Sequence, residues 1–278
     1  MQKRIAAIHD ISGFGKCSLT VALPLVSAAG IETAVIPTAV LSTHTGGFKN
    51  YTFRDLTDDI LPIAKHWKEN NLQFDAFYTG YLGSEKQVDI VIKSIKMLKT
   101  EKSVVVCDPA MADHGKLYAG FPNNFPKEML KLCKQADIIV PNITEAVLML
   151  GQEYSFGPYT KEYIEELVSR LYQKTKAKIV LTGVFFDDKK LGAVCFDGEK
   201  YNYIMSEKID AIFHGTGDVF ASVLTASLVT GRSLLSATEI AVKFTCDCIS
   251  ATLESEPERR YGVNFETEIP KLLRYLGK

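Results

Sequence analysis

The sequence lacks any long hydrophobic run. No stretch of its 278 residues reaches the roughly 18 consecutive apolar residues that a membrane-spanning helix requires. The first residues, MQKRIAAIHD, contain a charged start and only a short apolar run before Asp10, which is too little for the core of a signal peptide. We therefore expect a cytoplasmic protein that has no membrane segment.

An excess of charge of either sign is also missing. Lys and Arg together number 32 and Asp and Glu together number 33, so the formal net charge is −1. A protein built to coat nucleic acid needs a basic excess to neutralise phosphates. The balance predicts no nucleic-acid partner, although a local basic site remains compatible with it.

Metal-binding cysteine pairs and two familiar nucleotide motifs are absent as well. The six cysteines include no C-x-x-C pair, and Cys107 and Cys195 lie in apolar runs where a thiol behaves as a small hydrophobe. No G-x-x-x-x-G-K-[ST] occurs, which excludes a P-loop enzyme. The early glycine turn at Gly13 and Gly15 has Ser18 in place of the third glycine of G-x-G-x-x-G, which disfavours a Rossmann dinucleotide site.

The sequence instead alternates short apolar runs with longer amphipathic ones. The runs that predict strands are 4–11, 32–40, 76–83, 103–110, 136–142 and 178–186, with a hairpin at 191–197 and 200–208. The segments that predict helices are 17–29, 56–69, 85–98, 144–150, 161–174, 217–230, 234–253 and 265–276. Continuous apolar strands belong to sheets covered on both faces. The alternation predicts one α/β domain over residues 1–278, a three-layer α/β/α sandwich with a mostly parallel central sheet.

Polar residues follow most of the predicted strands. In an open parallel sheet, ligands bind beyond the carboxyl ends of the strands, so these residues converge on one edge. They are Asp10, Ser12, Ser42, Thr43, His44, Thr45, Thr79, Tyr81, Asp108, Asn142, Glu145, Thr182 and residues 214–218. Each has a simpler structural interpretation, such as Asp108 ending a strand or Glu145 complementing a helix dipole.

The sharpest motif is HGTGD at residues 214–218, which precedes a helix of small and apolar residues. Gly215 and Gly217 let a ligand approach the backbone, and the free N–H groups of the first helical turn attract an anion. A carboxylate such as Asp218 would repel a phosphate. Its presence is explained if it takes a proton from an alcohol that attacks the phosphate. The alternative is an ordinary turn with Asp in the first turn of the helix.

Several stretches together resemble the vitamin B6 kinases, the pyridoxal/pyridoxamine kinase branch of the ribokinase superfamily. HGTGD resembles the anion-hole motif of the superfamily. STHTGG, TGYLGS, CDPAM and ADIIVPNITEAVLMLG, at 42–47, 79–84, 107–111 and 136–151, resemble segments of the B6 branch in the family's order. The matches span roughly residues 4–230. The resemblance implies a ribokinase-like fold and transfer of the γ-phosphoryl group of ATP to the 5′-hydroxyl of pyridoxal, pyridoxamine or pyridoxine.

The resemblance also implies roles for individual residues. Asp218 would be the catalytic base, and the backbone amides of Gly215, Thr216, Gly217 and Asp218 would form the anion hole. The residues implied to bind ATP are Asp108, Asp113, Asn142, Glu145 and Thr182, of which Asp108 and Glu145 would hold Mg²⁺, partly through water. The residues implied to contact the vitamer are Asp10, Thr45, Gly46, Tyr81 and Asp218.

Position 10 departs from the B6 branch, where serine is common. A carboxylate at Asp10 can pair with a phenolic hydroxyl, a protonated ring nitrogen or an amine, so the preferred vitamer stays open. Residues 12–18, SGFGKCS, also look partly like the turn of hydroxymethylpyrimidine kinases of thiamine biosynthesis, which are the alternative enzyme class. A non-catalytic B6-binding protein is a further alternative, and a sugar kinase is disfavoured because no Gly-Gly-Asn-type turn is present.

ATP and Mg²⁺ are thus the expected cofactors, and a monovalent cation such as K⁺ is a further candidate. The expected partners are small molecules and, by family resemblance, a second copy of the chain in a homodimer.

Overall fold

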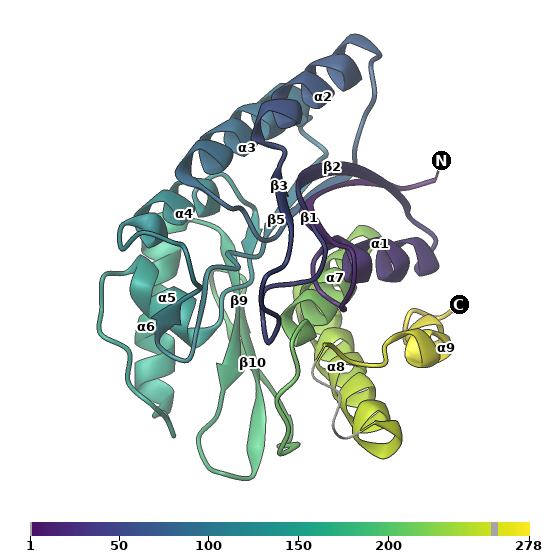
Figure 1. Ribbon diagram of the computed structural model, residues 1–278. Coiled ribbons are helices and arrows are strands. Elements are labelled where there is room, and N and C mark those ends of the chain that lie inside the picture. The colour runs from purple at the N-terminus through teal and green to yellow at the C-terminus, as the bar shows by residue number, and fades with distance from the viewer. Residues whose placement is uncertain (1, 257–260) are drawn as a thin grey trace.

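A nine-stranded sheet forms the middle layer of the molecule, in a computed structural model that describes residues 2–256 and 261–278 (Figure 1). The strand order is β11-β10-β9-β8-β5-β4-β1-β2-β3. The strands are β1 (Arg4–Ser12), β2 (Glu32–Leu41), β3 (Phe53–Asp55), β4 (Ala76–Thr79), β5 (Val104–Cys107), β8 (Ile138–Ile139), β9 (Lys178–Val184), β10 (Lys190–Phe196) and β11 (Tyr201–Glu207). Strands β6 (Ala112–Asp113) and β7 (Lys116–Leu117) form a separate small hairpin.

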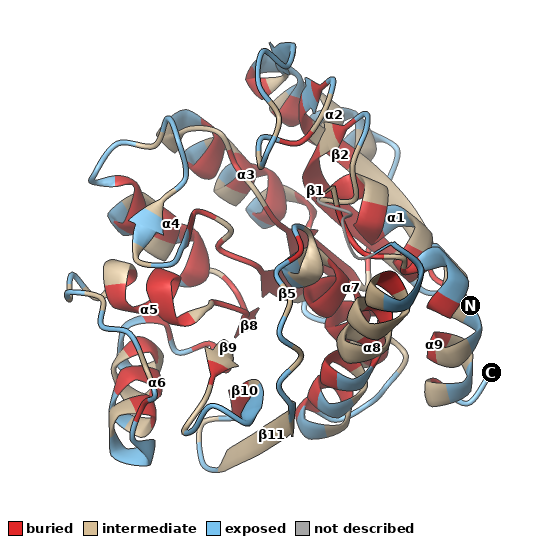
Figure 2. Ribbon diagram, turned by 60° about the horizontal axis from the view of Figure 1, so that its bottom comes forward, coloured by how far each residue is buried: buried red, intermediate tan, exposed pale blue. Residues whose placement is uncertain are grey.

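Helices cover both faces of the sheet and enclose two hydrophobic cores. One face carries α2 (Thr57–Glu69), α3 (Glu85–Leu98), α4 (Phe125–Cys133), α5 (Ile143–Met149) and α6 (Lys161–Thr175). The other carries α1 (Leu19–Ala28), α7 (Thr216–Val229), α8 (Leu234–Ser255) and α9 (Ile269–Tyr275), the last entered through a short 3-10 turn, η1 (Glu266–Glu268). Figure 2 shows the buried residues concentrated where helices meet the sheet. None of the helices in the described ranges is both long and apolar enough to cross a membrane.

The predicted three-layer architecture is confirmed. Strands β1, β2, β4, β5, β8 and β9 pair in parallel, whereas β3, β10 and β11 pair antiparallel at the two edges. All four residues of β4 and three of the four in β5 are buried, as expected for strands covered on both faces. The apolar runs at 103–110 and 136–142 are longer than β5 and β8, but single hydrogen bonds continue the pairing beyond β8, from Asp137 N–H to the Val105 carbonyl and from Val140 N–H to the Cys107 carbonyl.

Four elements were not predicted: β3, the β6–β7 hairpin and α4. The hairpin is only two residues on each side and turns at His114 and Gly115, both at positive φ. Such short elements carry no periodicity that a sequence pattern reveals. The helix predicted at 17–29 begins only at Leu19, because Ser18 takes a non-helical backbone conformation with φ 53° and ψ −127°.

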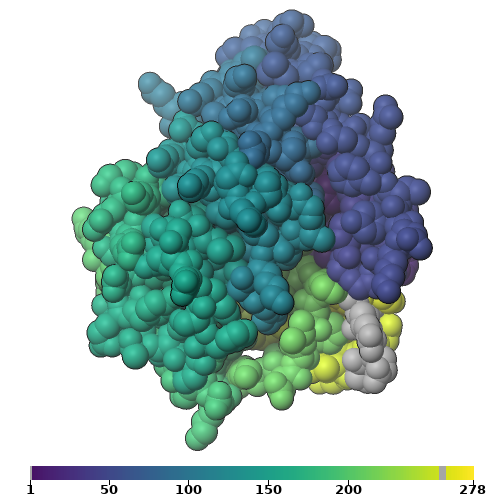
Figure 3. All heavy atoms as spheres, turned by 60° about the vertical axis from the view of Figure 1, so that its left-hand side comes forward, coloured from purple at the N-terminus to yellow at the C-terminus, as the bar shows by residue number. Residues whose placement is uncertain are grey.

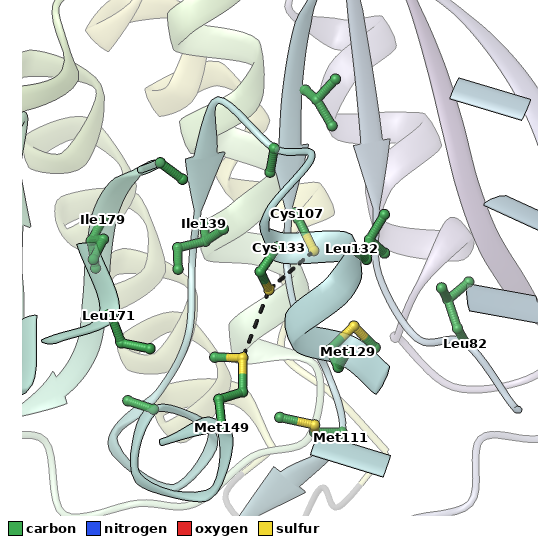
Figure 4. Close-up of a cluster of buried hydrophobic side chains, with 14 of the residues drawn as sticks. Leu82, Cys107, Met111, Met129, Leu132, Cys133, Ile139, Met149, Leu171 and Ile179 are labelled. Atoms are coloured by element: carbon green, nitrogen blue, oxygen red, sulfur yellow. Dashed lines mark hydrogen bonds between the residues drawn. The ribbon is translucent and has the colours of Figure 1, made fainter. Parts of the chain in front are cut away.

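Cys107 and Cys195 are buried, as their apolar runs predict. Cys107, on β5, and Cys133, on α4, are buried, and their sulfurs lie 3.9 Å apart among apolar side chains (Figure 4). The Cys133 thiol also lies 3.7 Å from the Met149 sulfur. No cluster of three or more potential metal ligands from His, Cys, Asp and Glu occurs in residues 2–256 or 261–278.

Candidate active site

The carboxyl ends of the central strands bring together side chains from distant parts of the chain. Asp10 lies near the end of β1, Asp108 follows β5, Glu145 lies in the first turn of α5, and Asp218 lies in the first turn of α7. They are close enough for the charge of one to raise the pKa of the next: Asp10 that of Asp218, Asp218 that of Asp108, and Asp108 that of Glu145. In Figure 3 the indigo, teal and green parts of the chain meet around a furrow on this side. The predicted convergence of these four residues is confirmed.

The start of α7 is shaped by a close approach of two backbones. Gly215, the N-cap residue, has a left-handed conformation with φ 77°. A Cβ atom at this position would lie 1.8 Å from the carbonyl oxygen of Lys16, so only glycine fits. Gly217 faces open space instead. The N–H groups of this first turn have no helical acceptors, and such a turn can hold an anion.

Asp218 is held beside this turn. Its carboxylate accepts a hydrogen bond from the backbone N–H of Ser18, which lowers its pKa, but burial outweighs this effect and raises the pKa to about 7. The charge of Asp10 raises it further. A carboxyl with a pKa near neutrality is suited to accept a proton at physiological pH. The geometry is therefore compatible with a general base.

Asp10 is buried, with 4% of its surface exposed. One carboxyl oxygen, Oδ2, accepts a hydrogen bond of 3.2 Å from the Ser12 hydroxyl, and the Ser18 side chain also interacts with the group. The other oxygen, Oδ1, has no hydrogen-bond partner among residues 2–256 and 261–278. The pairing of β1 with β2 shifts register between His9 and Ile11, so a bulge directs this residue away from the regular ladder. Burial raises the pKa of Asp10.

Glu145 and Asp108 differ in how they are supported. Glu145 completes a capping box with Asn142, and its two oxygens accept backbone N–H groups of Met111 at 3.1 Å and of Asn142 at 2.9 Å. The simpler interpretation of Glu145 as an early-helix carboxylate is thus confirmed, and it does not exclude a second role. The Asp108 side chain accepts no hydrogen bond from the described residues, and burial and the charge of Asp218 raise its pKa well above its ordinary value.

These two carboxyls fit a magnesium ion. Burial disfavours their charged forms, as do the charge of Asp218 on Asp108 and that of Asp108 on Glu145, and the pKa of each is raised well above its ordinary range. A divalent cation removes this repulsion, and Mg²⁺ prefers oxygen ligands and retains waters. Because the Glu145 oxygens already accept backbone hydrogen bonds, contact through water suits this residue.

The remaining residues predicted to bind ATP lie around this pair. Asn142 uses its amide within the protein, donating to the Ala112 carbonyl at 2.8 Å and accepting from the Glu145 N–H at 2.9 Å. Thr182 lies at the adjacent strand end, bridged to Asn142. Asp113 is exposed on the β6–β7 hairpin, 3.6 Å from His114. The ligand contacts of all three stay predictions.

The predicted vitamer contacts lie on the other side. Thr45 is exposed in the loop after β2, and a Cβ at Gly46 would lie 2.5 Å from the His214 ring. The rings of His44 and His214 lie at an angle of 49° to each other, with centroids 5.2 Å apart. Tyr81 packs near Phe121, and burial together with Asp10 raises its pKa to about 12. Contact with a vitamer stays a prediction for Thr45, Gly46 and Tyr81.

Two residues of the site were not predicted. Ser18 reaches both buried carboxyls, Asp218 through its backbone N–H and Asp10 through its side chain. Burial is the main cause of the raised pKa of Tyr118, and the charges of four carboxyls raise it further, namely Glu145, Asp113, Asp108 and Asp218. The position of Ser18 between a glycine turn and an apolar helix is the signature of a helix cap, which could have located it. No sequence signal distinguishes Tyr118.

Comparisons with known proteins agree with this arrangement. A Bacteroides thetaiotaomicron protein described provisionally as a phosphomethylpyrimidine kinase, whose crystals contain pyridoxal, is 38% identical with a TM-score of 0.92, over 98% of this chain and 96% of that one. The pyridoxal kinase of Lactobacillus plantarum is 29% identical with a TM-score of 0.89, over 99% and 97% of the two chains. The thiamine biosynthetic bifunctional enzyme TH1 of Arabidopsis thaliana is 28% identical over 80% of this chain and 42% of its own length.

The fold of this chain is thus ribokinase-like. A family model described as phosphomethylpyrimidine kinase matches residues 23–262, which is most of the chain. The chain belongs to the phosphomethylpyrimidine kinase family.

Proposed function

We propose that this protein is an ATP- and Mg²⁺-dependent kinase that phosphorylates the 5′-hydroxyl of a B6 vitamer. The observation that carries this proposal is the placement of the Asp218 carboxyl in the first turn of α7, next to the free amides that begin at Gly215. The pyridoxal in the Bacteroides relative and the activity of the Lactobacillus pyridoxal kinase support it.

Residues of the chain take part in both the proton transfer and the stabilisation of charge. Asp218 accepts the proton of the substrate hydroxyl as its oxygen attacks the γ-phosphorus of ATP, and the bond to the ADP oxygen breaks. The amides of Gly215, Thr216 and Gly217 stabilise the charge on the transferred group. Asp108 and Glu145 would hold Mg²⁺, whose charge offsets that of the phosphates.

The other residues position the two substrates. Asp113, Asn142 and Thr182 line the nucleotide side, with Asn142 acting through the Glu145 backbone it caps. Asp10, Thr45, Gly46 and Tyr81 line the vitamer side. We further propose that the enzyme is cytoplasmic and forms a homodimer, and that K⁺ is a candidate additional ion.

A hydroxymethylpyrimidine kinase is the second candidate, favoured by the matching family model and by the similarity to the thiamine enzyme. A coupled ADP assay with purified protein, ATP and Mg²⁺ separates the candidates. We expect kcat/KM to be higher for at least one of pyridoxal, pyridoxamine and pyridoxine than for hydroxymethylpyrimidine. The opposite order would transfer the assignment to the pyrimidine kinases, and no turnover with any of the four would refute both.

Glu145→Gln tests the proposed magnesium site. The amide is neutral and a weaker cation ligand, so we expect half-maximal activity to require several-fold more Mg²⁺ than in the parent. Glutamine retains one of the two backbone hydrogen bonds, so the thermal midpoint of each variant must be measured alongside. Glu166→Gln, at an exposed position on α6, is the matched control. A Glu145→Gln magnesium titration superimposable on that of the control would remove Glu145 from the metal site.

A further inference from the structure

Asp10 is an unusual residue for the floor of a binding site. Only 4% of the surface of Asp10 is exposed, and its Oδ1 accepts no hydrogen bond from the part of the chain that the structure describes. An unsatisfied buried oxygen carries a desolvation penalty that a partner would remove. Ser12 and Ser18 interact with only part of the carboxyl group, so one buried acceptor oxygen stays unpaired among the described residues.

No cation of the protein fills this place in the described ranges. The pKa of Asp10 is set by burial, by hydrogen bonds from two serines and by its own backbone. The pKa of Asp218 is set by burial, by the Ser18 N–H and by the charge of Asp10. Lys16 lies close in the sequence, but its ammonium pairs with Glu266 and stacks over Phe265. Without a partner, burial favours the neutral form of the Asp10 carboxyl, and a cationic group of the substrate would stabilise its charged form.

The position of Asp10 indicates which part of the substrate it would contact. Its charge acts on Asp218, which faces the hydroxymethyl group that is phosphorylated, and on Tyr81 on the vitamer side. We take the group attached next to the hydroxymethyl group on the ring to lie toward Asp10. In pyridoxamine this neighbour is an aminomethyl group, protonated at neutral pH, whereas in pyridoxal it is an aldehyde, which donates no hydrogen bond. Hydroxymethylpyrimidine also carries an amino group beside its hydroxymethyl group.

We infer that Asp10 is a specificity-determining residue that accepts a hydrogen bond from an amino group adjacent to the phosphorylated hydroxymethyl group, so that the enzyme selects amine-bearing substrates over the aldehyde. This inference rests on the proposed function and adds to it the chemical class of the preferred substrate. The serine common at this position in B6 kinases provides an uncharged hydroxyl. An aspartate in its place would therefore favour substrates with an amino group.

The test compares the parent, Asp10→Asn and Asp10→Ser with pyridoxamine, pyridoxine, pyridoxal and hydroxymethylpyrimidine. Asparagine has nearly the same shape and still accepts from Ser12, but it lacks the charge. We expect the ratio of kcat/KM for pyridoxamine to kcat/KM for pyridoxal to fall about 10- to 100-fold in both variants, the range that a charged hydrogen bond represents. The ratio of hydroxymethylpyrimidine to pyridoxal should fall in the same direction.

Two outcomes would overturn the inference. Equal losses for all three vitamers would place a group that they share, the ring nitrogen or the phenolic hydroxyl, against Asp10. An unchanged ratio would leave Asp10 as a residue that only supports the loop with Ser12 and Ser18.

Calorimetry on the parent enzyme keeps the inference testable if Asp10→Asn does not fold, as judged by its thermal midpoint. Pyridoxamine must then bind the parent more tightly than pyridoxal does, and equal or weaker binding would overturn the inference. The absence of turnover by the parent with every substrate would contradict the proposed function itself, which distinguishes the two failures.

Discussion

Replacement of Asp218 by asparagine is expected to lower kcat for the vitamer by about 10²- to 10⁴-fold, the usual contribution of a positioned general base. Asparagine retains the size of the side chain and an oxygen that can accept from the Ser18 N–H, but it does not take up a proton at neutral pH. Binding of the vitamer, measured by calorimetry without ATP, should change much less than kcat. Unchanged turnover would remove Asp218 from the chemical step.

The pH dependence of the parent enzyme checks the same carboxyl independently. Burial raises the pKa of Asp218 to about 7, so the group is increasingly protonated, and inactive as a base, as the pH falls below that value. The profile of kcat/KM, which reports groups of the free enzyme, should show an acidic limb near pH 7. A profile that remains flat down to pH 5 would contradict the role.

Replacement of Gly215 by alanine is expected to lower kcat/KM by about 10²- to 10³-fold, the cost of losing a donor from an anion hole. The new Cβ would lie 1.8 Å from the Lys16 carbonyl oxygen, and φ 77° is unfavourable for alanine. The turn must therefore move away from the loop before α1. Kinetics and thermal midpoints of the purified variant measure the effect.

Gly217→Ala is the matched control for the fold. A Cβ at position 217 meets no atom within 4 Å, and alanine favours the helix that begins here. The thermal midpoint of this variant should equal or exceed that of the parent, whereas that of Gly215→Ala should fall. Equal midpoints and equal kinetics for Gly215→Ala and the parent would show that the close approach to Lys16 has no consequence.

The sequence predicts the frame of the site better than its interior. Apolar runs such as VVVC and the polar residues that follow them place Asp108, Asn142 and Asp218 at one edge, because strand order is constrained once the sheet is parallel. The glycines of HGTGD also predict a turn at Gly215 and the start of a helix after it. These are local or topological properties, and a single sequence contains them.

Tertiary contacts account for what the sequence does not reveal. Glu145 accepts the Met111 N–H because of the path of residues 111–112, which no periodicity predicts. The open oxygen of Asp10 depends on burial and on which serines reach it. Tyr118 comes under the influence of four carboxyls only because a two-residue hairpin folds back toward α5.

The junction formed by Ser18 has a consequence for the exchange of segments between related enzymes. Ser18, at the beginning of α1 and with φ 53°, interacts with the carboxyls of both Asp10 and Asp218, which are far apart in the sequence. A chimera that takes its first helix from one parent and its last helices from another would join halves of this junction that were not selected together. Residues 10–18 and 213–218 should therefore be transplanted as a unit, even though almost two hundred positions separate them.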